Sequence, residues 1–507
     1  MNESPVTGTP GPDAASRVQA IVSLASRGDV AGAMAAADAI TDRAVAIEAW
    51  RRLSEVNANM QRWDEAISAI EKALFRAPDS RHLRLARALL LGQQGNDAAA
   101  LAALESLARE AADSPGLMAH LAAQLAAAGR VDEAEAQLVG ALDRWPVEAS
   151  LHTQLARLRW QRGDGDAATR DVLQAIERHP RELHLRLVAA DLLRHAGDID
   201  TALALLERGL ELAPDSPIFR TSIGVLLENA DRLDAALVQL REAFRLAPRS
   251  VAVRRNLVPA LLRTGAAAEA RDLLDSLLAQ FPDDQLLIAQ RATALRLLGD
   301  AEYHRLYDYA RVVKSFALRP VAPFTNIAEF NAAFARELAP LHRGARHPLE
   351  QSLRGGSQTE RHLPRDNPVI AAFFSMLDEP IREYVRALRD ADAAHPLDRR
   401  KRAGYRISGS WSVQLRPGGF HTDHVHPRGW LSSAYYVALP DVSDAQGRGG
   451  WLKFGEPAMR IPGCGPELFV RPAEGMLVLF PSYLWHGTVA FDAGPTRLTA
   501  AFDVLPA

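Results

Sequence analysis

Residues 421–439 begin with the densest group of metal-binding side chains in the 507-residue chain. Three histidines and an aspartate, His421, Asp423, His424 and His426, fall within six residues. His424 and His426 are two residues apart, so in an extended backbone their side chains leave the same face and can bind one ion. A segment with alternating, strand-like periodicity follows. We therefore expect a metal site at the end of a β-strand.

Two further segments carry side chains that could complete such a site. His486 ends a second apolar run, sixty residues after His426. Arg497 and Thr499 are two residues apart in the last strand-like segment, so they share one face and could hold a carboxylate. Cys464 is the only cysteine, so any metal must be bound by His, Asp or Glu rather than by a thiolate cluster.

In combination these motifs resemble a bacterial subgroup of the Fe(II)- and 2-oxoglutarate-dependent oxygenases. The shared motifs are HxHP at 424–427, SSAYYV at 432–437, GxLVLFPSxLxH at 475–486 and RLT at 497–499. The resemblance covers residues 317–507 and implies a double-stranded β-helix, or jelly roll. It implies that His424, His426 and His486 bind Fe(II), and that Arg497, Thr499 and Tyr436 bind 2-oxoglutarate. The implied reaction uses molecular oxygen to hydroxylate a substrate.

The ligand assignment has an alternative within the same motif. His421 and Asp423 form an HxD pair, the common form with two histidines and a carboxylate, whereas the HxHP form replaces the carboxylate with His426. The proline after His426 and the distance to the Tyr435–Tyr436 pair favour HxHP. In that form Asp423 could accept a hydrogen bond from a ligand. Trp485 and Tyr483, beside His486, are candidates for the border of a substrate opening.

The first half of the chain is an internal repeat. Its marker residues recur every 34 residues: alanine at Ala66, Ala100, Ala134, Ala168, Ala202, Ala236 and Ala270, and glycine at Gly95, Gly129, Gly163, Gly197, Gly265 and Gly299. Apolar helical spacing on both sides of the glycine predicts a helix hairpin, which is similar to the tetratricopeptide repeat. We expect a solenoid over residues 15–316, with full repeats over 47–284 and a capping repeat at each end. Residues 1–14 are expected to be disordered.

The remainder is predicted to be a β-domain supported by helices, which makes the protein a multidomain α + β chain. Prolines at 320 and 323 mark the boundary, and helical periodicity covers 326–341 and 367–390, with Asn367 as an N-cap. Residues 351–359 are interpreted as a loop, structural or in contact with substrate. Period-two strands are predicted at 405–415, 431–439, 452–454, 468–470, 476–480 and 498–504.

Composition narrows the choice of partners. A net charge of −3 argues against nucleic acid and an anionic membrane surface. The first residues lack the basic and apolar regions of a signal peptide, and no apolar run could span a membrane, so we expect a cytoplasmic protein. A repeat solenoid usually binds a protein or peptide, although this one could only pack on the β-domain. Two hypotheses follow: an oxygenase acting on a protein or peptide recruited by the repeats, or an interaction adaptor with an inactive or non-oxidative metal-binding domain.

Overall fold

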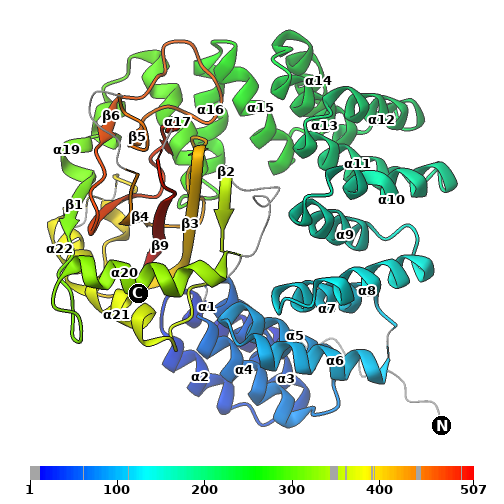
Figure 1. Cartoon of the computed structure of the whole chain (residues 1–507). Coiled ribbons are helices and arrows are strands. Elements are labelled where there is room, and N and C mark those ends of the chain that lie inside the picture. Colours follow the sequence, from blue (N-terminus) through cyan, green and yellow to red (C-terminus); the bar gives the residue numbers. More distant parts are fainter. Residues whose placement is uncertain are drawn as a thin grey trace, which may run out of the picture. The chain divides into compact units, whose positions relative to one another are not determined.

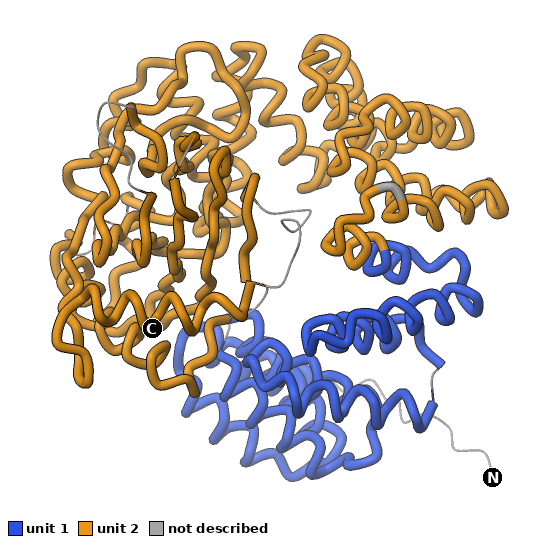
Figure 2. The backbone as a smooth tube through the Cα atoms, in the orientation of Figure 1, with its two compact units in different colours: residues 1–155 blue, residues 156–507 orange. Residues whose placement is uncertain are grey.

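The computed structural model forms two compact units, Met1–Leu155 and Ala156–Ala507, which Figure 2 colours separately. The residues that it describes are 12–60, 62–111, 113–342, 352–359, 362–389, 392, 394–440, 447–492 and 494–507. The division falls within a helix of the repeat array, so the second unit contains the last repeats as well as the β-domain. Residues 1–11 of the expected disordered segment lie outside the described residues, and a helix begins at Pro12.

Paired helices occupy the chain up to residue 298 (Figure 1). In the first unit they are α1 (Pro12–Ser26), α2 (Val30–Asp38), α3 (Arg43–Asn59), α4 (Trp63–Arg76), α5 (Arg81–Gln94), α6 (Asp97–Glu110), α7 (Pro115–Ala127), α8 (Val131–Arg144) and the start of α9 (Ala149–Arg162). In the second unit they are α10 (Gly165–Arg178), α11 (Leu183–Ala196), α12 (Ile199–Leu212), α13 (Pro217–Asn229), α14 (Leu233–Leu246), α15 (Val251–Arg263), α16 (Ala267–Leu278) and α17 (Gln285–Leu298). The predicted helical solenoid is confirmed.

The repeat positions explain these helices in physical terms. The marker alanines Ala66, Ala134 and Ala236 are fully buried, because a small side chain lets two helices approach closely. The marker glycines adopt positive φ at the turn between helices, a conformation that costs glycine little. In the repeat that follows Gly197, Asp231 takes the place of this glycine with a φ of 61°. Aspartate is one of the few other residues that tolerate this conformation.

The last repeat departs from the helix-hairpin pattern. After α17, two short helices, α18 (Glu302–Leu306) and α19 (Tyr309–Val312), replace a second long helix. The chain then enters strand β1 (Lys314–Ala317), which pairs with β7 of the β-domain. On α17, Ile288, Ala289 and Leu295 belong to the same hydrophobic core as the large sheet. The end of the array is thus packed into the β-domain.

Two antiparallel sheets form the β-domain, as expected for a jelly roll. The large sheet has the order β1-β7-β4-β9-β3-β2 and the small sheet β6-β5-β8. The strands after β1 are β2 (Leu353–Gln358), β3 (Tyr405–His421), β4 (Leu431–Ala438), β5 (Leu452–Phe454), β6 (Leu468–Val470), β7 (Met476–Pro481), β8 (His486–Thr488) and β9 (Arg497–Pro506). All six predicted strands are present, and β1, β2 and β8 are additional.

The predicted helices pack on the large sheet. They are α20 (Ile327–Leu338), α21 (Pro368–Met376), which Asn367 caps as expected, and α22 (Asp378–Ala387). Tyr435 of β4 lies against the rings of Phe334 and Phe373 and donates a hydrogen bond to Asn331 Oδ1 at 2.6 Å. This aromatic layer closes one face of the domain. No helix among the described residues is both long and apolar enough to cross a membrane.

The interpretation of residues 351–359 as a loop was wrong for most of the segment. Six of these residues form β2, which pairs with β3 at the edge of the large sheet, while Gln351 lies outside the described residues. A Cβ atom on Gly356 would lie 2.2 Å from the Gln414 carbonyl oxygen, and Gly355 has a φ of 68°. The paired glycines therefore allow a close, bulged strand pairing, which local sequence alone does not distinguish from a loop.

Candidate metal centre

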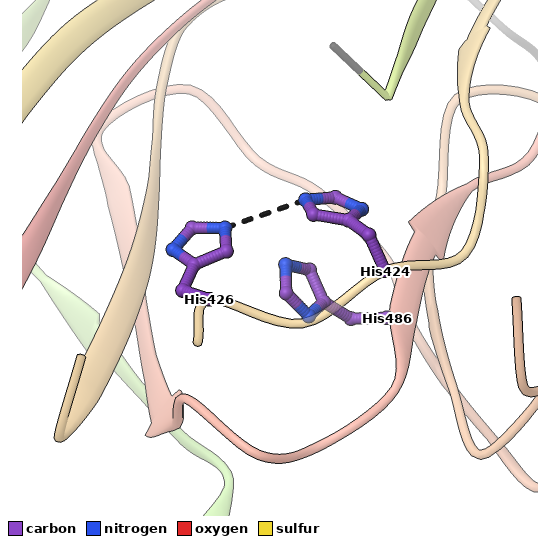
Figure 3. A group of neighbouring side chains, drawn as sticks. All are labelled: His424, His426 and His486. Carbon is purple, nitrogen blue, oxygen red and sulfur yellow. Dashed lines mark hydrogen bonds between the residues drawn. The ribbon is translucent and has the colours of Figure 1, made fainter. Parts of the chain in front are cut away.

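Backbone pairing brings the two histidine-bearing segments together where the sheets meet. The His424 N–H donates to the His486 carbonyl at 2.9 Å, and the His486 N–H donates back at 3.1 Å. His426 lies two residues beyond His424, before β4 of the large sheet, whereas His486 begins β8 of the small sheet. One potential ligand atom from each of the three histidines lies within 4.8 Å of the other two (Figure 3). The structure thus brings together the three histidines of the HxHP assignment.

A hydrogen bond at Nδ1 orients each of the three imidazoles. His424 Nδ1 lies 2.8 Å from the Thr422 carbonyl, and His486 Nδ1 lies 2.9 Å from the Leu484 carbonyl. Because a carbonyl only accepts, these two rings must carry the proton on Nδ1 and present an unprotonated Nε2. The Nε2 atoms of His424 and His426 are 3.3 Å apart. This is the tautomer and convergence that a metal bound through Nε2 requires.

Burial keeps His424 and His486 neutral without a metal. It lowers the pKa of His424 to about 3, and repulsion from His426 adds to the effect. Burial, followed by the nearby His424 and His426, holds the pKa of His486 well below its usual value. Because a metal binds the unprotonated imidazole, the site does not need to release protons from these two rings near neutral pH.

Asp503 provides the hydrogen-bond partner of the third histidine, and the sequence interpretation missed it. His426 Nδ1 lies 2.6 Å from Asp503 Oδ1, which also accepts a hydrogen bond from Ser432 at 2.8 Å. A signal was present, since Asp503 follows Arg497 and Thr499 at even spacing on the same strand face. A carboxylate is therefore placed one hydrogen bond away from the three-histidine cluster.

The alternative pair lies next to this cluster. Asp423 accepts a hydrogen bond from Lys453 at 2.8 Å, and burial raises the pKa of its carboxyl to about 6. The suggested role of Asp423 as acceptor for a ligand is filled by Asp503. The His421 ring lies 5.7 Å from that of His424, centroid to centroid, and its Nδ1 is 3.0 Å from the Ser352 hydroxyl. His421 is thus a neighbour of the three-histidine cluster.

Arg497, the first residue of β9, is a buried cation. Its side chain is only 2% exposed, and its guanidinium lies 5.1 Å from the centre of the Tyr436 ring. Tyr436 and Thr499 are paired across β4 and β9. Among the residues that the structure describes, no carboxylate forms an ion pair with Arg497, and its Nε has no hydrogen-bond partner. A buried guanidinium in this state favours binding of an anion.

Trp485 and Tyr483 do not border an opening. Trp485 is 2% exposed, and its indole N–H donates to Thr293 on α17 at 3.0 Å. Tyr483 is equally buried, and its hydroxyl donates to the Leu306 carbonyl at 3.0 Å. Both side chains thus point toward the end of the repeat array.

Comparison with known families gives separate matches for the helical repeats and for the β-domain. Residues 409–503 match the family described as "Putative 2OG-Fe(II) oxygenase". Residues 57–115 and 153–217 match one tetratricopeptide repeat family, and residues 229–295 match a second. The oxygenase match contains His424, His426, His486, Arg497 and Asp503.

Solved structures similar to the chain are repeat proteins. A thermophilic TPR protein from Thermus thermophilus is 25% identical, with 36% of this chain and 100% of that chain covered and a TM-score of 0.28. A tetratricopeptide repeat protein from Parabacteroides merdae is 17% identical, with 49% and 98% covered and a TM-score of 0.32. No curated protein matches the chain. On the family matches, the chain joins tetratricopeptide repeats to a domain of the 2OG-Fe(II) oxygenase family.

Proposed function

We propose that the protein is an Fe(II)- and 2-oxoglutarate-dependent dioxygenase that hydroxylates a protein or peptide recruited by its repeats. The observation that carries this proposal is the pairing of two sites in one small region. One is the cluster of His424, His426 and His486, in which one potential ligand atom of each ring lies within 4.8 Å of the other two. The other is the buried Arg497, which has no carboxylate partner among the described residues.

The two sites share one strand. Arg497 lies on β9, and so does Asp503, the hydrogen-bond partner of His426. A small dianion such as 2-oxoglutarate has a carboxylate at each end, so one end could reach the metal while Arg497 binds the other.

Each part of the chain has a defined role in this proposal. Bound Fe(II) with 2-oxoglutarate supplies an oxidant, formed from molecular oxygen as 2-oxoglutarate is decarboxylated to succinate. His424, His426 and His486 would hold the metal and would leave its other coordination positions to the cosubstrates. Arg497 offers the planar fork that matches a carboxylate, and the hydroxyls of Thr499 and Tyr436 provide further hydrogen bonds. The low exposure of these residues keeps water away from the reactive centre.

The observed ligand set departs from two histidines and a carboxylate, and Asp503 compensates for part of the difference. A neutral third ligand leaves more positive charge on the metal. The hydrogen bond from His426 Nδ1 to Asp503 transfers negative character toward the ring and raises its basicity. We therefore propose that His426 with Asp503 takes the place of the usual carboxylate.

Recruitment is assigned to the repeats. We propose that residues 15–316 form the recruiting array and residues 317–507 the oxygenase domain. Repeats of this class bind proteins through surfaces built from successive hairpins. In the second unit, Ile218 on α13 and Val238 on α14 are large apolar side chains that remain 60% and 66% exposed. They are available for contact with a polypeptide.

The test is turnover of 2-oxoglutarate by the purified full-length protein. With Fe(II), oxygen and a peptide library, we expect succinate to form and a peptide to gain one oxygen atom in mass. The His486→Ala variant should show neither product. Metal-loaded protein that converts no 2-oxoglutarate in the presence or absence of any library member would contradict the proposal.

A second function is favoured by the three-histidine set itself. Three imidazoles without a carboxylate also suit Zn²⁺, so the domain could be a non-oxidative metal site on an interaction adaptor. Metal analysis of protein purified without added metal separates the two functions. Zinc at one equivalent, no succinate formation and partner capture that depends only on residues 47–284 would support the adaptor.

A further inference from the structure

We propose that α17, the last long helix of the repeat array, is part of the scaffold of the metal centre and that Thr293 is a positioning residue for His486. This inference rests on the proposed function only in that the three histidines bind a metal. It concerns the array itself: the helix that ends the recruiting segment would also determine how well the metal is held.

The first link runs through the residue next to a proposed ligand. The Trp485 indole N–H donates to Thr293 Oγ1 at 3.0 Å, and Thr293 Oγ1 in turn donates to the Ala289 carbonyl at 3.0 Å. The second bond uses the hydroxyl hydrogen, so a lone pair of the same oxygen is left for the indole. Thr293 and Trp485 are 4% and 2% exposed. Because both side chains are buried from solvent, this bond restrains the backbone from which His486 extends.

The second link reaches the other ligand-bearing segment. The Gln285 backbone N–H, in the first turn of α17, donates to the Pro427 carbonyl at 3.2 Å. First-turn N–H groups have no partner within their own helix, so the loop after His426 supplies one. One helix therefore contacts the segments that hold both halves of the histidine cluster.

A third link closes a ring of hydrogen bonds around the same place. The Gly455 N–H donates to the Trp485 carbonyl at 3.0 Å, and Arg296 of α17 donates to the Gly455 carbonyl at 2.9 Å. Arg296 also pairs with Glu467 at 3.3 Å. Trp485 is thus held by α17 directly through its side chain and indirectly through its carbonyl.

Packing makes this contact rigid. The buried face of α17, including Ile288, Ala292 and Leu295, belongs to the core that also contains Trp485 and Phe480. A helix in a close-packed core cannot shift without moving its neighbours. The array and the metal centre therefore share one support, even though the expected domain boundary lies at residue 316.

The experiment measures Co(II) binding to the full-length protein, with Co(II) as a redox-stable probe of the Fe(II) site. Thr293→Val keeps the shape of the side chain and removes the hydroxyl, and should weaken Co(II) binding about 10-fold, the lower end of the effect of a lost outer hydrogen bond. Thr293→Ser restores the hydroxyl and should restore the affinity. Thr221→Val is the matched control, because Thr221 on α13 is buried and donates to the carbonyl four residues earlier at 2.7 Å.

The outcomes separate this inference from the proposed function. If the wild-type protein binds no Co(II), the proposed function fails. If it binds Co(II) and Thr293→Val binds it equally well, or if Thr221→Val weakens binding as much, the positioning role is overturned. Should Thr293→Val fail to fold, Trp485→Phe removes the same hydrogen bond from the other side and is judged by the same affinities.

Discussion

The three histidines and Arg497 lie on neighbouring elements of one domain, but they differ in whether the chain itself provides a partner for their polar groups. Each histidine is hydrogen-bonded at Nδ1 to a group that the chain itself provides. The partners are the carbonyls of Thr422 and Leu484 and the carboxylate of Asp503. Arg497 is buried with its charge and without a carboxylate among the described residues. The metal end is therefore organised before anything binds, whereas the guanidinium end still needs a ligand for its charge.

This difference has an energetic meaning. A buried imidazole that is neutral costs little, so the histidine cluster can wait for a metal without destabilising the fold. A buried guanidinium without a counter-charge carries a desolvation cost that a bound anion would offset. Burial accordingly lowers the pKa of Arg497 from its ordinary value. Binding of an anionic ligand should therefore increase the free energy of unfolding.

The largest expected effect is at the metal end. His486→Ala should abolish detectable Co(II) binding, because it removes one of the three proposed ligands. This ligand is the one that comes from the small sheet. His184→Ala, on the exposed surface of α11, should bind Co(II) as the wild type does. Calorimetric titration measures both. Retained binding by His486→Ala would mean that the cluster in Figure 3 is not the metal centre.

The next effect is at the guanidinium end and has two parts of opposite sign. Arg497→Met should weaken 2-oxoglutarate binding to the Co(II)-loaded protein by on the order of 100-fold, since it removes a buried charge partner. The ligand-free variant should be at least as stable as the wild type, because the unpaired charge is gone. Titration and thermal unfolding measure the two parts. If Arg497→Met is much less stable than the wild type and binds 2-oxoglutarate equally well, Arg497 stabilises the fold and does not bind the cosubstrate.

A smaller effect on Co(II) affinity is expected from the charge of Asp503, which is hydrogen-bonded to His426. Asp503→Asn keeps a hydrogen-bond acceptor for His426 but removes the carboxylate, and should weaken Co(II) binding about 10-fold. Asp272→Asn, which changes an exposed carboxylate on α16, is the control. Equal affinities for the two variants would show that the charge of Asp503 does not reach the metal.

A pH dependence of the metal-free protein is also expected. His424 has a pKa near 6.5 when unfolded and about 3 in the fold, so between these values the unfolded chain binds more protons. Stability should therefore fall as the pH drops from 6.5 toward 3, by up to about 1.4 kcal/mol per pH unit from this residue. His424→Gln should flatten the wild-type curve in chemical unfolding across this range. Parallel curves for the two proteins would contradict the burial of a neutral His424.

Much of the fold could be predicted because its signals are local and periodic. The 34-residue spacing of Ala66 and its equivalents depends on helix contacts that every repeat makes in the same way. The strands with strict alternation were also predictable. Strand β2 was not, because its glycines read as a loop and only its pairing with β3 makes it a strand.

The candidate site shows the same division. The even spacing of His424 with His426 and of Arg497 with Thr499 predicts shared faces. Asp503 continues the second pattern, yet nothing local indicates that its carboxylate meets a histidine 77 residues away. The reversal for Trp485 has a similar cause: its position beside His486 suggested an opening, and only the packing of α17 shows that it is buried.

Sequence alone therefore determined which side chains this protein has for chemistry, which of them share a face, and that helical repeats precede a β-domain. Those properties follow from backbone periodicity, which acts over a few residues. Tertiary structure alone decided that His486 lies beside His424, that Asp503 rather than Asp423 is hydrogen-bonded to His426, and that Thr293 of α17 accepts a hydrogen bond from Trp485. Such contacts depend on burial and hydrogen bonding between distant segments, and these exist only once the chain has folded.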